Sequence, residues 1–86
     1  MEVIKRDGRG VEYDRNKILV AIRKANDEVR MKEKISEGKI EGIVRAIESL
    51  NKPTMQVEEI QDISEEKLME DGKYTLAKTY ILYRYT

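Results

Sequence analysis

The chain has 86 residues, enough for one small domain, and its 17 basic and 17 acidic side chains cancel to a net charge of zero. It contains no cysteine and no histidine, which excludes a disulfide framework, a zinc ribbon and the side chain that most often serves as general base or metal ligand. The zero net charge argues against broad nucleic-acid binding, which requires a basic excess, so any anion site has to be local.

The N-terminal residues predict a β-hairpin that leads into a helix. We expect strands at residues 3–6 and 11–13, and a tight turn at Asp7-Gly8, where glycine tolerates the positive φ that such turns need. Asp14 is predicted to cap a helix over residues 14–29, because its carboxylate can accept a backbone N–H of the first turn.

Three more helices are predicted from apolar residues at helical spacing. The second follows a charged connection over residues 31–36, carries Leu50 at the end of its apolar face, and stops at Asn51-Lys52-Pro53, because a residue before proline disfavours the helical region. The third stops at Asp71-Gly72, where glycine suits the left-handed position after a helix, and the fourth runs from Tyr74 to the end. Residues 55–57 are too few for an independent strand but can add to the edge of the hairpin.

These elements predict a single α+β domain over residues 1–86 that is mostly α. The expected architecture is a four-helix bundle capped by a small β-hairpin or three-stranded sheet. No internal repeat or domain linker interrupts the chain. Because the chain stops inside a well-formed helix, we expect it to be a module cut from, or fused to, a longer protein.

Composition and motifs point away from catalysis and from membranes. The acidic pairs in the third predicted helix, such as Glu58-Glu59 and Glu65-Glu66, are typical of a solvated helix face, and no Walker A loop is present. No apolar run approaches the roughly 20 residues that span a bilayer, and the N-terminus has no signal-peptide pattern. We therefore expect a cytoplasmic protein that is not an enzyme by itself and has no membrane contact.

Three cations converge on the corner between the hairpin and the first helix. Lys5 and Arg6 precede the turn, and Lys17 lies one turn inside the helix. Charges of this kind are often only solvated surface, but clustered cations at a helix N-terminus are also a ready place for phosphate. The apolar residues expected beside them are Val3, Tyr13 and Ile18. A slot with an apolar floor and a cationic rim suits a nucleotide.

The same residues resemble the ATP-cone domain of ribonucleotide reductases and of the bacterial repressor of reductase genes. The resemblance is carried by Val3-Ile-Lys-Arg-Asp-Gly-Arg9, then Tyr13-Asp-Arg-Asn-Lys-Ile18, then Ile22-Arg-Lys-Ala25. Val57-Glu-Glu-Ile60 resembles the family's short third strand running into a helix, and Ala77-Lys-Thr-Tyr80-Ile-Leu-Tyr-Arg84 resembles its closing helix. The resemblance covers essentially the whole chain.

The resemblance implies a regulatory module that binds ATP or dATP, with Mg²⁺ carried by the nucleotide, and that uses the choice between them to set oligomeric state and activity. By position, the phosphate ligands would be Lys5, Arg6 and Lys17. The residues bordering the adenine would be Val3, Tyr13 and Ile18, with further polar contacts from Asp14 and Gln61. Arg84 suits either a binding or a structural role.

One departure concerns reading of the base. Relatives often carry a glutamate two residues before the aromatic, but here that position is Val11, and Glu12 is expected on the opposite strand face. A second departure is that no reductase catalytic domain is visible, so the chain would be part of, or partner to, a reductase. The alternative is a small helical interaction domain whose basic hairpin meets a protein or a nucleic-acid phosphate.

Aromatic residues are concentrated at the end of the chain. Four of the five tyrosines fall in the last predicted helix, at positions 74, 80, 83 and 85. With 100° between successive residues they cannot all face one core. We therefore expect at least one tyrosine at a surface used for self-association or for docking to a reductase catalytic domain.

Overall fold

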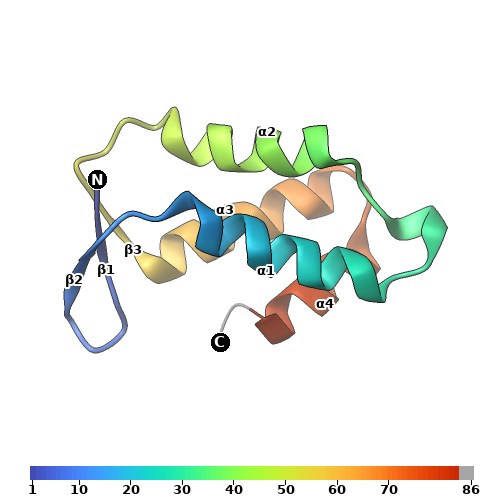
Figure 1. Cartoon of the computed structure of the whole chain (residues 1–86), viewed down its shortest axis with the longest axis horizontal. Helices are drawn as coiled ribbons and strands as arrows, with labels where there is room; N and C mark the ends of the chain where they lie inside the picture. The colour runs from blue at the N-terminus through green and yellow to red at the C-terminus, as the bar shows by residue number, and fades with distance from the viewer. Residues whose placement is uncertain (84–86) are drawn as a thin grey trace.

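The computed structural model describes residues 1–83, which form four α-helices, a short 3₁₀-helix and a three-stranded sheet (Figure 1). The elements follow one another in the order β1 (Glu2–Ile4), β2 (Gly10–Glu12), α1 (Arg15–Glu28), η1 (Met31–Glu33), α2 (Glu37–Glu48), β3 (Thr54–Gln56), α3 (Val57–Glu70) and α4 (Tyr74–Tyr83). The predicted class, α+β and mostly α, is confirmed. The 3₁₀-helix η1 lies within the stretch that the sequence predicted as a charged connection.

The helices form a closed bundle around one apolar core. Helix α1 packs on α2 and α4, and α3 packs on the same two helices. Each helix contributes a side chain with no solvent exposure: Ile22, Ile40, Leu68 and Leu76. Figure 1 shows the three strands together at one end of this bundle, opposite the loop between α1 and α2. None of the helices within residues 1–83 is long and apolar enough to cross a membrane.

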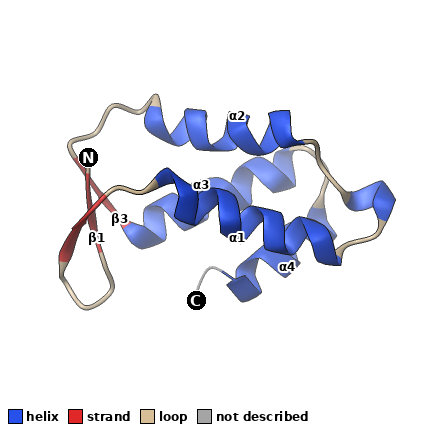
Figure 2. Ribbon diagram, viewed as in Figure 1, coloured by secondary structure: helices blue, strands red, loops and turns tan. Residues whose placement is uncertain are grey.

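The sheet has the order β2-β1-β3, with β1 in the centre (Figure 2). Val3 of β1 lies opposite Val11 of the antiparallel β2 and opposite Met55 of the parallel β3. Val3 and Met55 are buried, which fastens the sheet to the core. The prediction that residues 55–57 add to the hairpin edge is confirmed, with one shift, because the strand ends at Gln56 and Val57 already begins α3.

The hairpin turn is longer than the two-residue turn that Asp7-Gly8 suggested. The N–H of Lys5 donates to the carbonyl of Arg9 at 2.8 Å, and the N–H of Gly8 donates to the carbonyl of Lys5 at 2.9 Å. Gly8 has a φ of 89°, so the glycine supplies the left-handed residue of a three-residue loop. The first strand ends at Ile4 and not at Arg6 as predicted, which leaves Arg6 in the turn, where its side chain points toward α3.

The predicted helix ends are confirmed where capping chemistry defined them. Asp14 accepts the N–H of Asn16 at 3.0 Å at the start of α1. After α3, Gly72 has a φ of 74°, and its N–H donates to the carbonyl of Met69 while that of Lys73 donates to Leu68, as in a Schellman motif.

The end of α2 differs from the prediction. The helix stops at Glu48, and Leu50, expected on its buried face, is 46% exposed. The reason is Asn51, which has a φ of 58° and turns the chain out of the helix before proline is reached. Helix α4 separates its tyrosines as expected, because Tyr80 is buried while Tyr74 is 60% exposed. Arg84 and Tyr85 lie outside the described residues.

Candidate functional site

A cavity of about 750 Å³ opens where the hairpin, α1, the start of α3 and α4 meet. Small-molecule sites in proteins typically measure roughly 300–1,000 Å³, so this cavity is large enough for a nucleotide-sized ligand. All eight residues that the sequence singled out line it: Val3, Lys5, Arg6, Tyr13, Asp14, Lys17, Ile18 and Gln61. They come from three separate parts of the chain, and the fold brings them together.

The walls of the cavity are largely apolar. Val3 from β1 and Ile60 from α3 are buried in the core with only an edge toward the cavity. Ile18 from α1 and Val57 from α3 are partly buried and pack against the same core. Tyr80 closes the side formed by α4. A flat apolar group entering here would meet side chains already held in place by the core.

Three lysines stand at this cavity without an ion-pair or hydrogen-bond partner among the described side chains. Lys5 belongs to the turn, while Lys17 and Lys24 are exposed on α1. None of the three forms an ion pair or donates a side-chain hydrogen bond within residues 1–83. Lys24 was not predicted. Its position seven residues after Lys17, about two helical turns, was the signal in the sequence that places it on the same face.

Unlike the three lysines, Arg6 forms side-chain bonds to other residues. Its Nε lies 3.1 Å from Oε1 of Glu58, and its NH2 group donates to Oε1 of Gln61 at 2.7 Å. Gln61 is 8% exposed, so this amide is a buried acceptor at the base of the cavity. The sequence predicted Arg6 and Gln61 separately, but it did not indicate that they bond to each other or that Glu58 joins them.

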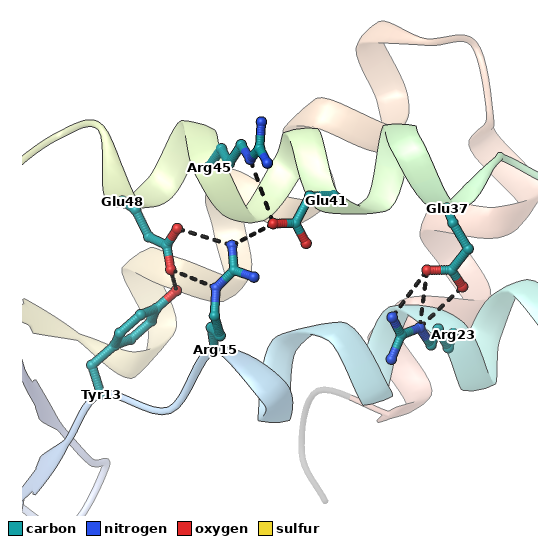
Figure 3. A network of polar contacts seen from close by, with 7 residues as sticks. All are labelled: Tyr13, Arg15, Arg23, Glu37, Glu41, Arg45 and Glu48. Atoms are coloured by element: carbon teal, nitrogen blue, oxygen red, sulfur yellow. Dashed lines mark hydrogen bonds and ion pairs between the residues drawn. The ribbon is translucent and has the colours of Figure 1, made fainter.

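Tyr13 presents its ring to the cavity while its hydroxyl is held from outside it. The hydroxyl donates to Oε2 of Glu48 on α2 at 2.8 Å, and Glu48 does not line the cavity (Figure 3). Burial, together with the hydrogen bond to Glu48, raises the pKa of Tyr13 well above its usual range. The side chain therefore stays neutral, and its hydroxyl is already committed to α2.

Arg15 builds the rest of this network. Its Nε lies 3.0 Å from Glu48 Oε2, and its NH2 group lies 2.7 Å from Glu41 Oε1, which also faces Arg45 at 3.5 Å (Figure 3). The hydrogen bonds to Arg15 hold the pKa of Glu48 and of Glu41 below the ordinary value. The network joins the first turn of α1 to α2 and fixes the aromatic wall of the cavity.

Acidic residues also reach the rim. Asp7 accepts a hydrogen bond from Nε of Arg9 at 2.7 Å, and Asp14 accepts the N–H of Asn16 at the N-terminus of α1. Val11 and Glu12 both line the cavity, while burial alternates along β2, where Val11 is half-buried and Glu12 is exposed. Among residues 1–83, no group of three or more acidic side chains could hold a metal ion.

Comparison with known proteins gives one family. The family model described as ATP cone domain matches residues 1–86. The vitamin B12-dependent ribonucleoside-diphosphate reductase of Thermoplasma acidophilum is 44% identical over an alignment of 91 positions that covers 96% of this chain and 11% of that protein. The ribonucleoside-diphosphate reductase subunit alpha of Chlamydia muridarum is 35% identical over an alignment of 95 positions that covers 98% of this chain and 9% of that protein. The chain thus spans about a tenth of the length of these relatives.

The Arg15 network predicts a specific acid sensitivity. Because the pKa values of Glu41 and Glu48 are lowered in the folded chain, their ion pairs contribute full stability above the ordinary value of 4.5 and lose it as the pH falls through the lowered values. Replacing Arg15→Gln should therefore flatten the fall in the free energy of unfolding between about pH 5 and pH 3, measured by urea unfolding.

The matched control is Arg30→Gln, because Arg30 is exposed and forms no ion pair within the described residues. This variant should keep the steep acid dependence of the parent chain. Equal slopes for the parent and Arg15→Gln would show that the network does not couple stability to pH.

Proposed function

This chain belongs to the ATP-cone family, and we propose that it binds ATP or dATP in the cavity between the hairpin, α1 and α3. An ATP-cone is a regulatory adenine-nucleotide domain, and the relatives named above are reductases in which it is only a part. The observation that carries the proposal is an apolar-walled cavity surrounded by three lysines that have no ion-pair partner within residues 1–83.

The phosphates are proposed to lie at the corner between the turn and α1. Lys5 and Lys17 approach this corner from different elements, and both are free to bond to oxygen. The N-terminus of α1 adds the positive end of a helix dipole, which favours an anion. Mg²⁺ would arrive bound to the phosphates, and Lys24 would extend the cationic rim along α1.

The adenine is proposed to lie against Val3, Tyr13 and Ile18, deeper in the cavity. Since Glu48 already accepts the Tyr13 hydroxyl, the ring would contribute packing to the base rather than a hydrogen bond. Asp14 and Gln61 are the polar groups proposed to contact the nucleotide on either side. The carboxylate of Asp14 keeps its capping bond in this arrangement, and Gln61 keeps its bond to Arg6.

Binding is proposed to control assembly of a reductase. The cavity reaches α4 through Tyr80 and Tyr83, so a ligand would touch the helix that also carries the exposed Tyr74 and Leu82. Tyr74 and Leu82 are 60% and 70% exposed, and they lie eight residues apart on α4, close to one helix face. We propose this face for self-association or for docking to a reductase catalytic domain, with the choice between ATP and dATP setting which contact forms.

Thermal unfolding with nucleotide tests the function directly. A ligand at 100 times its dissociation constant stabilises the folded state by about 2.7 kcal/mol, which raises the melting temperature of a domain of this size by several degrees. We expect this rise with millimolar ATP-Mg²⁺ or dATP-Mg²⁺. No shift with either nucleotide would favour the alternative, a small interaction domain with a basic hairpin.

Lysine variants test the placement of the phosphates. Each charge-assisted hydrogen bond contributes roughly 1.5–3 kcal/mol, so Lys17→Ala and Lys5→Ala should each weaken ATP binding about 10- to 100-fold in calorimetry. Stability without ligand should change by less than about 0.5 kcal/mol, as for ordinary surface substitutions. Adenosine should bind the parent and both variants equally.

Lys78→Ala is the matched control, because Lys78 is exposed on α4 and does not line the cavity. It should bind ATP as the parent does. If Lys17→Ala also binds ATP as tightly as the parent, the phosphates bind elsewhere.

Light scattering tests the proposed face on α4. The parent should change its mass between ATP and dATP, or bind a reductase catalytic domain in a nucleotide-dependent way, and Tyr74→Ser should remove that response while leaving ATP affinity unchanged. A response of Tyr74→Ser identical to that of the parent would exclude this face.

A further inference from the structure

The contact between Arg6 and Glu58 joins the hairpin turn to α3 across 52 residues of sequence. Resting on the function proposed above, we propose that Glu58 competes with the nucleotide phosphates for Arg6 and thereby sets the affinity of the domain for a triphosphate. While the cavity is empty, Arg6 would be paired with the carboxylate of Glu58. When a nucleotide binds, Arg6 would release this carboxylate and bond to a phosphate oxygen. Glu58 is thus an affinity-determining residue that lies outside the set lining the cavity.

The turn depends on Arg6 for its attachment to the helices. Within residues 5–9, the other side-chain bonds stay inside the turn, where Asp7 accepts from the backbone and the guanidinium of Arg9. No side chain of this turn other than Arg6 bonds to a helix in the described part of the chain. Whatever draws Arg6 away from Glu58 therefore also changes how the turn is held over the cavity.

The bonds of Arg6 to Glu58 and to Gln61 differ in how easily they can be exchanged. Arg6 and Glu58 are 39% and 59% exposed, and an ion pair this open to water is weak. Gln61 is buried and neutral, so its bond to Arg6 does not compete electrostatically with an anion. A guanidinium has five N–H donors in a fixed plane, so Arg6 can keep Gln61 while it trades Glu58 for phosphate. Phosphate offers a bidentate partner of higher charge than a carboxylate.

Glu58 therefore acts differently in the empty and in the bound domain. In the empty domain its carboxylate holds the turn through Arg6. In the bound domain Arg6 has left this carboxylate for a phosphate oxygen, so the ion pair with Glu58 is lost and its loss lowers the net gain from binding. A simple structural role, as an acidic residue in the first turn of α3, would instead favour the folded chain equally with and without ligand.

Calorimetry on the parent and on Glu58→Gln tests the proposal. Loss of the competing charge should tighten ATP binding about three- to fivefold, since a half-exposed ion pair contributes modestly. Adenosine binding should not change, because adenosine has no phosphate to exchange. The melting temperature without ligand should fall slightly, while the temperature rise caused by ATP should become larger than in the parent.

Two further variants make the test specific. Glu66→Gln removes the same charge from the exposed side of α3, away from the cavity, and should change ATP affinity less than about twofold. In an Arg6→Gln background, Glu58→Gln should also have less than about a twofold effect, because the competition requires Arg6.

The possible outcomes distinguish a failure of this inference from a failure of the proposed nucleotide binding on which it rests. If the parent does not bind ATP, the proposed function fails. If the parent binds ATP but Glu58→Gln leaves the affinity unchanged or lowers it, or if its gain persists in the Arg6→Gln background, Glu58 does not compete for Arg6 and the inference is overturned.

Discussion

The pairing of β1 with β3 is the constraint on which the site depends. Val3 sits between Val11 and Met55, and because both Val3 and Met55 are buried, the central strand cannot shift its register without exposing apolar surface. Strand β3 runs directly into α3, so the same register fixes the hairpin against the first turn of that helix. This is why Arg6 meets Glu58 and Gln61, and why the cavity has α3 on one side and α1 on the other.

Although the net charge is zero, the ion-paired and the unpaired cationic side chains lie in different parts of the molecule. Many acidic residues have a cationic partner away from the cavity, as in the pairs Arg15–Glu48, Arg23–Glu37, Lys39–Asp71 and Lys52–Glu59. The lysines around the cavity have no such partner within residues 1–83. The chain therefore keeps a local cationic site without the basic excess that would attract anions at large.

The residues that line the cavity come from both the first and the last elements of the described chain. Its lining runs from the hairpin to Tyr80 and Tyr83 of α4, and a hydrogen bond to Glu28 at the end of α1 raises the pKa of Tyr83. A ligand seated there would touch the first strand, the first helix and the last helix together. Such a position suits a regulatory domain, since one binding event can bias the contacts of α4 with α1, the helix against which it packs.

Local chemistry in the sequence was sufficient for much of this protein. Asp14 and Gly72 mark helix ends by their own hydrogen-bonding and φ preferences, and Lys5 and Lys17 flank one corner whatever the rest of the chain does. Tertiary structure alone decided the long-range pairings. Arg6 turns to α3 because the hairpin loop has three residues and β3 adds in parallel, and Tyr13 loses its free hydroxyl because α2 brings Glu48 beside it. Partners separated by 35 to 55 residues leave no periodic signal, because their meeting depends on how the helices and strands pack and not on the residues between them.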